Sequence, residues 1–170
     1  LEPFFNALKE INHLEKAISE AIIAEDMIAD TASDKLYKIR RDIKKCESNV
    51  RDVLSRYITG GSSKYLQENI VTTRNGRFVV PVKAEHKNEI KGLVHDTSAS
   101  GATLFIEPLA VLEENNKLRE LKIAESDEIE RILSALSEQT AAQGTTLVLD
   151  YRALTDLAAI FAKAEYSYSI

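Results

Sequence analysis

The stretch HDTSASG contains side chains that, brought together, could catalyse hydrolysis: His95, Asp96, Ser98 and Ser100. In a serine hydrolase the serine attacks the substrate, a histidine takes its proton, and an acid orients the histidine. Adjacent residues on a strand point to opposite faces, so His95 and Asp96 cannot readily orient one another. Aspartate, serine and glycine are also common turn residues, and Gly101 suits a left-handed conformation. The stretch therefore predicts a structural turn and no catalytic residue.

The sequence offers no framework for a metal or a nucleotide. The three histidines, His13, His86 and His95, are scattered, and the single Cys46 has no histidine at a zinc-ligand spacing. One cysteine leaves no intrachain disulfide to form, so a cytoplasmic setting fits. The segment GGSSK at 60–64 lacks both the spacing and the preceding strand of a phosphate-binding GxxxxGK[ST] loop. We therefore expect no cofactor and no metal in this chain.

Basic side chains gather in the middle of the chain. Between residues 62 and 95 they outnumber acids by six to three, the acids being Glu68, Glu85 and Glu89. Phosphate contact needs lysine and arginine but no sequence-reading constellation, whereas simple solvation explains such an excess equally well. Arg74 and Arg77 are the leading pair because they flank a predicted turn. The candidate nucleic-acid contacts are Arg74, Arg77, Lys83, Lys87, Lys64 and Lys91.

Four polar or aromatic residues also have candidate roles. Tyr65 and Phe78 could stack on an exposed base, although Phe78 fits a core position better. Asn115 and Asn116 follow the predicted strands, and we expect them to satisfy backbone groups where a sheet meets a helix. That role is structural.

The net charge of -5 is unevenly distributed along the chain. Residues 1–33 carry two lysines against seven acids, whereas residues 34–57 carry eight lysines and arginines against four acids. Two explanations fit this pattern. Helices of opposite charge could pack side by side and pair their charges, or the basic segment could form a track towards a polyanion.

The composition favours long helices. The chain has 170 residues, 44% of them hydrophobic, with only six Gly and three Pro, which suits one ordinary domain with few turns. No run of 18 apolar residues could span a bilayer. The sequence starts at Leu1 rather than Met and ends in mid-pattern at AKAEYSYSI, so we expect a segment of a longer protein.

Apolar spacing predicts the helices. The strongest pattern has intervals of three and four residues and is typical of a helix packed lengthwise on another: Leu36, Ile39, Ile43, Cys46, Val50, Val53 and Tyr57. Asp34 and Gly60-Gly61 supply its end signals. Residues 1–30 carry a weaker apolar stripe and predict a helix before it, making a helical hairpin. A third helix of some 30 residues follows Pro108, and a fourth follows the break at Gly144.

The segment between the second and third helices predicts strands. Ile70–Thr73 and Phe78–Val82 flank Asn75-Gly76, the dipeptide typical of a two-residue hairpin turn. Pro81 cannot donate a hydrogen bond, so its strand is expected at an edge or with a bulge. LVHDT at 93–97 and TLFIE at 103–107 predict a second strand pair around SASGA.

The sequence thus predicts a mainly α fold (α+β) with a small antiparallel β insertion between helices 2 and 3. Its three parts are two helices in 1–59, the β-rich insertion in 60–107, and a returning helix and a final helix in 108–170.

Three blocks of the sequence resemble a known family: DTASDKLYKIRRDI, NIVTTRNGRFVVPVKAEHK, and GLVHDTSASGATLFIEPLAVLEENNKLRELK, the last followed by EIERIL. They are similar to the middle region of the bacterial MutS-two family, a group of MutS paralogues usually called endonuclease MutS-two. The resemblance covers nearly the whole chain, and RNGRFVVPVK and HDTSASGATLFIEP are its most specific pieces. It implies a core, lever and clamp module, in which long helices carry the β insertion, the clamp, towards duplex DNA and relay its state to an ATPase.

The resemblance also implies partners and activities. The parent protein is expected to be a homodimeric ATPase, using ATP and Mg, and an Smr-type endonuclease, both through domains absent here. It would bind duplex or branched DNA, or the ribosome and its rRNA, and would restrain recombination or rescue stalled ribosomes. For this chain the resemblance implies a cytoplasmic, nucleic-acid-engaging relay module that is no enzyme itself and has no membrane partner. The alternative is a purely structural or dimerisation module whose parent makes its contacts elsewhere. The family supplies no residue-level contact.

Overall fold

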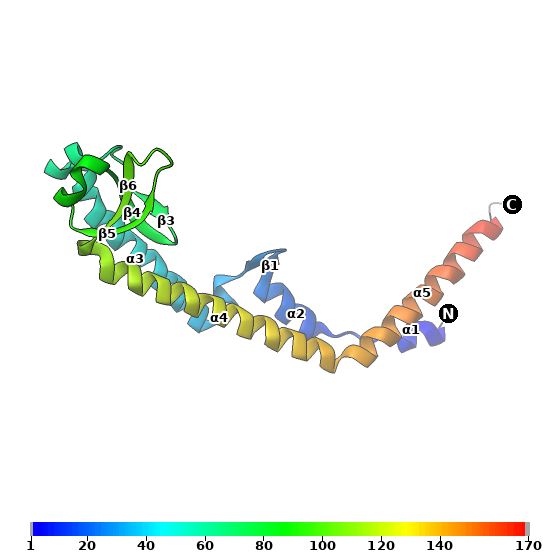
Figure 1. Cartoon of the computed structure of the whole chain (residues 1–170). Helices are drawn as coiled ribbons and strands as arrows, with labels where there is room; N and C mark the ends of the chain where they lie inside the picture. Colours follow the sequence, from blue (N-terminus) through cyan, green and yellow to red (C-terminus); the bar gives the residue numbers. More distant parts are fainter. Residues whose placement is uncertain (1, 169–170) are drawn as a thin grey trace. The chain divides into compact units, whose positions relative to one another are not determined.

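The computed structural model describes residues 2–168 (Figure 1). It is 69% helical and contains two small antiparallel sheets, so the predicted fold class is confirmed. The described residues form two compact units. One is Asp34–Glu128, called here the sheet unit, and the other combines the residues up to Ser33 with those from Ile129 onward, called the helical unit. The predicted boundary at 59/60 coincides with the end of the helix Asp34–Thr59, and that at 107/108 falls one residue before the end of the strand Thr103–Pro108. As domain boundaries both stay a prediction.

The sheet unit contains one long helix, a four-stranded sheet with short 3-10 helices (η) in its connections, and the first part of a second long helix. In chain order its elements are α3 (Asp34–Thr59), η2 (Gly61–Tyr65), β3 (Thr72–Arg74), β4 (Arg77–Lys83), η3 (Ala84–Glu89), β5 (Gly92–Thr97), β6 (Thr103–Pro108), η4 (Leu109–Val111) and α4 (Leu112–Ala142). Pro108, expected in the first turn of the third helix, is instead the last residue of β6, and η4 separates it from α4.

Helix α3 buries the side that the apolar spacing predicts. Its fully or nearly buried residues are Leu36, Ile39, Ile43, Cys46, Val50 and Leu54. The predicted apolar positions from Leu36 to Val50 are all buried. Beyond Val50, Leu54 is buried in place of Val53, and Val53 and Tyr57 are half-buried. The helix ends before Gly60, whose N–H donates to the Arg56 carbonyl (3.0 Å). A Cβ at Gly60 would lie 2.4 Å from that oxygen, so glycine is required here.

The four strands lie in the order β3-β4-β6-β5, and every pair is antiparallel. Asn75 and Gly76, with φ of 53° and 74°, form the predicted two-residue turn between β3 and β4. The second predicted strand pair is β5 and β6, and Gly101 in its connection has the expected left-handed φ of 73°. A Cβ at Gly92 would lie 2.1 Å from the Glu107 carbonyl oxygen. Only glycine at position 92 therefore allows the start of β5 to lie this close to β6.

Pro81 lies differently from the prediction of an edge strand or a bulge, because β4 is an inner strand. Pairing with β3 stops at Val79, and beyond it the Pro81 carbonyl accepts a hydrogen bond from the Gln67 N–H (2.9 Å). The nitrogen and carbonyl of one strand residue point to the same side. The nitrogen of Pro81 therefore faces the segment around Gln67, where an isolated bridge between Leu66 and Val82 replaces the regular ladder and the missing donor is tolerated.

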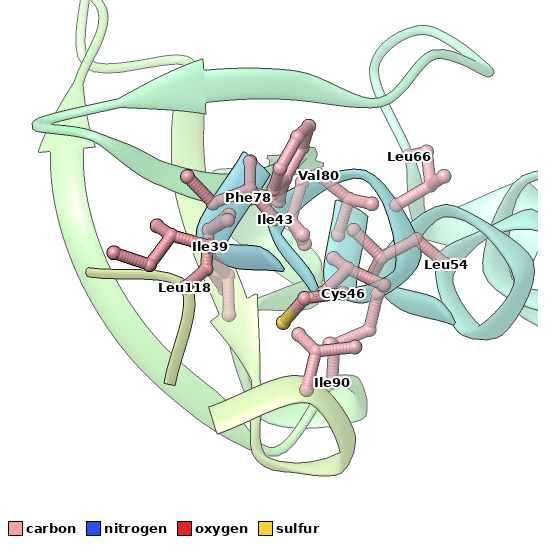
Figure 2. Close-up of a cluster of buried hydrophobic side chains, with 13 residues drawn as sticks. Ile39, Ile43, Cys46, Leu54, Leu66, Phe78, Val80, Ile90 and Leu118 are labelled. Atoms are coloured by element: carbon pink, nitrogen blue, oxygen red, sulfur yellow. The ribbon is translucent and has the colours of Figure 1, made fainter. Parts of the chain in front are cut away.

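The core of the sheet unit lies between α3 and the inner face of the sheet. Figure 2 shows Ile43, Cys46 and Leu54 of α3 beneath Phe78 and Val80 of β4. Leu66, Ile90 and Leu118 close the cluster from the connections and from α4. Helices α3 and α4 run side by side (Figure 1), joined by the Cys46 Sγ, which donates to the Glu114 carbonyl (3.2 Å). The sheet is thus packed directly onto both long helices.

The helical unit contains the helices near both ends of the described chain. Its elements are α1 (Glu2–Ala7), α2 (Asn12–Ala21), β1 (Ile22–Ala24), β2 (Met27–Ile28), η1 (Asp30–Ala32), the second part of α4 and α5 (Gly144–Tyr168). The predicted third and fourth helices are confirmed, with the break next to Gly144. No described helix has the length and apolar character needed to cross a membrane.

The first segment corrects one prediction, because its apolar stripe belongs to no single continuous helix. Residues 8–11 interrupt it, and after Ala21 the chain forms a small hairpin in which Ile22 pairs with Ile28. The β-branched Ile22 and Ile23 before Glu25-Asp26 favour a strand and a turn over a helix. The first predicted helix therefore ends at Ala21 rather than near residue 30, and the connection to α3 is longer than predicted.

Candidate nucleic-acid interface

The first turn of α4 binds the sheet through the side-chain amide of Asn115. Its Nδ2 donates to the Phe78 carbonyl (3.1 Å), and its Oδ1 accepts from the Phe78 N–H (3.2 Å). The register of β4 and β6 pairs Val80 with Ile106, so Phe78 would next face Pro108, which has no N–H. Asn115 supplies the donor and the acceptor that β6 lacks at this point. The structural role expected for this asparagine is the one it has.

Glu107, which is fully buried near the end of β6, accepts hydrogen bonds from three side chains. Arg77 binds it with two nitrogens, Nε to Oε2 (2.7 Å) and Nη2 to Oε1 (2.6 Å). Asn115 Nδ2 donates to Oε1 (2.8 Å), and His95 Nε2 contacts Oε2. Arg77 Nη2 also donates to Asn116 Oδ1 (2.7 Å). These five residues, the Glu107 cluster, tie β4, β5, β6 and α4 together through one carboxylate.

The pKa of Glu107 reflects two opposed influences. Burial raises it, because a buried carboxylate loses its hydration, but hydrogen bonds from Arg77, Asn115 and His95 favour the ionised form. The net result is a pKa below the ordinary value of 4.5. A depressed pKa in the folded state means that the carboxylate stabilises the fold above its unfolded pKa, and that this contribution is lost as pH falls through the folded value.

We therefore expect acid to weaken the sheet unit through Glu107. The free energy of unfolding should fall as pH drops below about 4.5, the ordinary pKa of a glutamate. Urea unfolding at neutral pH and at successively lower pH would measure it. A variant with Arg77→Met and Glu107→Leu lacks the titrating group and should lose less stability over the same range. Equal losses in the two proteins would contradict the assignment.

The structure argues against Arg77 as a phosphate contact. Only 11% of its side chain is exposed, and its guanidinium is already bound by Glu107 and Asn116. Releasing it to a nucleic acid would leave a buried carboxylate without its cation, at a cost of several kcal/mol. Arg77 has a structural role in this geometry, and its contact with a phosphate stays a prediction.

Arg74 is held on the outer face of the sheet. Its guanidinium carbon lies 3.8 Å from the centre of the Phe105 ring, and its Nε is 3.3 Å from Asp96 Oδ2. Nη1 donates to the Thr73 carbonyl (2.8 Å). About a third of the side chain (34%) stays exposed. Because Asp96 already offsets part of its charge, Arg74 is a weaker candidate than its place beside the turn suggested.

The β3–β4 turn faces α4. Asn75 and Gly76 line a groove of about 550 Å³ with Arg119, Lys122 and Ile123 of that helix. The amide of Asn75 also donates to the His95 carbonyl (3.2 Å). The turn therefore lies near the start of α4, at what we call the root of the sheet. The opposite end of the sheet, where Ala84 N–H donates to the Ala102 carbonyl (3.0 Å), carries η2 and η3.

Lys64 and Lys83 meet at this far end, and Lys87 lies on η3, one residue after the His86 that contacts Tyr65. Lys64 lies on η2 with its Nζ 5.0 Å from the centre of the Tyr65 ring, and Lys83 Nζ donates to the Lys64 carbonyl (3.3 Å). The Tyr65 and His86 rings, 5.1 Å apart, pack η2 against η3. We call Lys64, Lys83 and Lys87 the lysine corner. Among the described residues, no carboxylate oxygen lies within 4.0 Å of these three ammonium groups, although Glu85 and Glu89 share η3.

Lys91 and Phe78 lie outside this corner. The Lys91 carbonyl accepts from the Leu109 N–H (3.0 Å), which places Lys91 beside η4 at the root. Phe78 is buried, and Arg51 lies over its ring at 4.9 Å, so it cannot stack on a base. Tyr65 is the one predicted stacking residue that stays half-exposed.

The HDTSASG stretch forms the predicted turn. Ser98 Oγ accepts from the Thr103 N–H (3.1 Å), and the Gly101 N–H donates to the Ser98 carbonyl (2.9 Å). His95 contacts Glu107, whereas Asp96 pairs with Arg74, so the two side chains serve different partners. No histidine–aspartate pair of a hydrolase is formed.

Two further segments have no chemical role in this geometry. Burial and the nearby Glu114 raise the pKa of Cys46 to about 11, which keeps it a neutral thiol in the core. The segment at 60–64 follows helix α3 and enters η2, so it lacks the strand-to-helix geometry of a phosphate-binding loop. That no nucleotide binds within this chain stays a prediction. Within the described residues there is also no group of three or more histidine, cysteine, aspartate or glutamate side chains able to hold a metal ion.

Comparisons with curated proteins place the chain in a family. It is 46% identical over 166 residues to Endonuclease MutS2 of Clostridium perfringens (strain SM101 / Type A), a match covering 98% of the chain. It is 44% identical to the protein of that name from Clostridium botulinum (strain Alaska E43 / Type E3) and 47% identical to that of Pelotomaculum thermopropionicum. The chain belongs to the MutS2 family. It spans 21% of the length of these MutS2 proteins. No family model matches the chain.

Sequence reasoning missed the central residue of the MutS2 sheet. The sequence analysis treated Glu107 only as the end of a strand, although it binds Arg77. It treated Phe105 only as a strand residue, although its ring stacks on Arg74. A signal was present. Glu107 is the sole acid within TLFIEP, a run otherwise suited to a buried strand, and a buried acid requires a cation partner.

Proposed function

We propose that this chain is the nucleic-acid-engaging and conformational-relay module of a larger MutS2 protein, and that the lysine corner is its phosphate contact. The observation that carries the proposal is the gathering of Lys64, Lys83 and Lys87 at the far end of the sheet without a paired carboxylate. Arg77 is left out of the contact set because Glu107 holds it, and Arg74 and Lys91 are peripheral members.

Contact through phosphates suits this corner. Each lysine that neutralises a phosphate releases condensed counterions, so affinity falls steeply with salt and depends little on base sequence. Three lysines support only non-specific affinity, with a Kd of roughly 10⁻⁴ to 10⁻⁶ M. Tyr65, whose ring Lys64 and His86 flank, offers a stacking surface for an unpaired base. A homodimeric parent holding two corners together would bind more tightly through avidity.

The relay part of the proposal rests on the Glu107 cluster. Arg77, His95 and Asn115 join three strands of the sheet to the first turn of α4 by short hydrogen bonds. A joint of this kind transmits a displacement of the sheet to the helix, because little of it can be absorbed by local bending. We infer that the sheet and the start of α4 move as one body.

The remaining proposals concern the longer protein. Its relatives are named as endonucleases, and we propose that the parent is an Smr-type endonuclease and an ATPase using ATP and Mg, through segments outside the matched fifth. We propose duplex or branched DNA, or ribosomal RNA, as its partner, with a role in restraining recombination or rescuing stalled ribosomes. A cytoplasmic homodimer is the form we expect.

Charge reversal at the corner tests the proposed contact. Replacing Lys64, Lys83 and Lys87 by glutamate should abolish the salt-dependent binding of the chain to nucleic acid, because three attractive charges become repulsive. Fluorescence anisotropy with duplex DNA, branched DNA and ribosomal RNA at two salt concentrations would measure the effect and rank the partners.

The matched control replaces three exposed lysines of the helical unit by glutamate and changes the net charge by the same amount as the corner variant. These lysines are Lys9, Lys16 and Lys163. It should bind almost like the wild type. Circular dichroism must show that both variants are folded. If the corner variant binds no more weakly than the control, or if the wild-type binding is insensitive to salt, the lysine corner is not the contact.

A purely structural or dimerisation module is the second candidate, and α5 favours it. This helix exposes more than half of the side-chain surface of Leu149, Tyr151, Leu154 and Phe161. Exposed apolar side chains in such number indicate a packing surface. If this surface joins two copies of the chain, light scattering should show a dimer for the wild type. The variant with Leu154→Glu and Phe161→Glu should then be a monomer.

A further inference from the structure

The outer face of α3 carries a second group of cations, distinct from the lysine corner. Lys38, Arg41, Lys44 and Lys45 are all exposed, and at 100° per residue they point away from the buried side of the helix. We call these four residues the α3 basic face. The exposed acids nearest along the same side, Asp34 and Asp52, stand beyond its two ends.

Charged residues on the side of α3 that faces α4 form ion pairs with that helix, whereas those on the outer side do not. On the side facing α4, Arg40 Nε lies 2.6 Å from Glu125 Oε1, and Lys35 Nζ lies 3.1 Å from Glu128 Oε2. Glu47 of α3 likewise pairs with Lys122 of α4 (3.4 Å). The packing of basic on acidic helix segments, one of the two explanations of the charge pattern, therefore uses these residues and not the α3 basic face.

The α3 basic face has almost no partner of its own. Arg41 Nη2 is 3.7 Å from Asp42 Oδ1, the only carboxylate within 4.0 Å of these four cations among residues 2–168. Lys38 and Arg41 are three residues apart, and Arg41 and Lys45 are four apart, spacings at which like charges repel on a helix. Asp42 offsets only part of this repulsion, and a bound polyanion would relieve the rest.

We infer that the α3 basic face is a second contact surface for the phosphate backbone of a nucleic acid. The inference rests on the proposed function for the class of partner, but on different residues. Charge complementarity supports it, because four unpaired or weakly paired cations within about two helical turns match the closely spaced charges of a phosphate backbone. Tyr37, 53% exposed next to Lys38, adds an aromatic surface beside these charges. Contact here brings the long helix itself onto the nucleic acid.

The salt dependence of binding tests this inference. A variant with Lys38→Gln, Lys44→Gln and Lys45→Gln keeps good helix formers on an exposed face and should remain folded. The slope of log Kobs against log salt for a labelled DNA duplex, over about 50 to 200 mM, should fall by about 2 to 3, close to 0.9 for each lost phosphate contact. The same three substitutions at Lys9, Lys16 and Lys163 should leave the slope unchanged.

Failure of this inference can be told apart from failure of the lysine corner. An unchanged slope in the α3 variant, with a reduced slope when Lys64, Lys83 and Lys87 are changed to Gln, overturns the α3 basic face alone. A reduced slope in the α3 variant, with an unchanged slope in the lysine-corner variant, overturns the lysine corner and supports the α3 basic face. If polyglutamate competes with the labelled duplex as well as unlabelled duplex does, the face binds acidic polymers in general and the assignment to nucleic acid is wrong. Absence of wild-type binding at low salt overturns both sites.

Discussion

Replacing Val50 by aspartate is expected to unfold the sheet unit. Val50 is completely buried on α3, in the cluster that contacts β4 and α4. An aspartate there would bury a charge with no cation provided for it, at a cost of about 3 to 5 kcal/mol, a large share of a typical domain's stability. Thermal unfolding followed by circular dichroism should show the sheet unit melting far below the wild type or already unfolded.

Ser48→Asp supplies the matched control, because Ser48 lies on the same helix but is exposed. It adds the same charge to α3 without burying it, and should change the stability by no more than about 0.5 kcal/mol. A melting curve for Val50→Asp that coincides with that of Ser48→Asp would show that the apolar side of α3 is not packed as described.

The elements of the sheet unit followed from local sequence signals. The three- and four-residue spacing from Leu36 to Val50 and the glycine at position 60 define α3 without any knowledge of its partner. Asn75-Gly76 defined the hairpin, because few other dipeptides accept positive φ at both positions. Such signals depend on residues close in sequence, and they identified the fold class correctly.

The roles of Arg74 and Arg77 could not be found in this way. Arg77 and Glu107 are 30 residues apart, and only the strand order β4-β6 brings them together. A sequence shows a cation beside a turn but does not show that a buried acid on another strand will bind it. The first segment was mispredicted for another reason, because the apolar stripe was weighed above the local strand and turn signal after Ala21.

One conclusion about charge follows from these particular residues. The basic side chains of the sheet unit divide into those held by carboxylates, such as Arg77, Arg40 and Lys35, and those without such a partner, at the lysine corner and on the α3 basic face. The net charge of a segment cannot separate the two groups. We propose the second group as the phosphate contacts, which removes Arg77 from the candidates of the sequence analysis and adds the four residues of the α3 basic face.

Glu107→Leu is expected to be the most damaging single change at the root of the sheet. It removes the only carboxylate that Arg77 contacts within 4.0 Å among the described residues and leaves a guanidinium that is 11% exposed without a counter-charge. Breaking a buried ion pair by deleting one partner costs about 3 to 5 kcal/mol. His95 and Asn115 lose an acceptor as well. Urea unfolding should show a midpoint far below that of the wild type.

The double variant Arg77→Met, Glu107→Leu decides whether this loss comes from the orphaned charge or from the packing of the joint. Replacing both members of a buried pair by apolar side chains is often nearly neutral, because the desolvation cost disappears together with the attraction. Most of the stability lost in Glu107→Leu should therefore return.

The hydrogen bonds of Asn115 to the Phe78 backbone remain in the double variant and should still hold α4 to β4. Amide hydrogen exchange at Phe78 would report this directly. If the double variant is as unstable as the single one, the loss comes from the broken hydrogen bonds and packing of the Glu107 cluster rather than from the unpaired charge of Arg77.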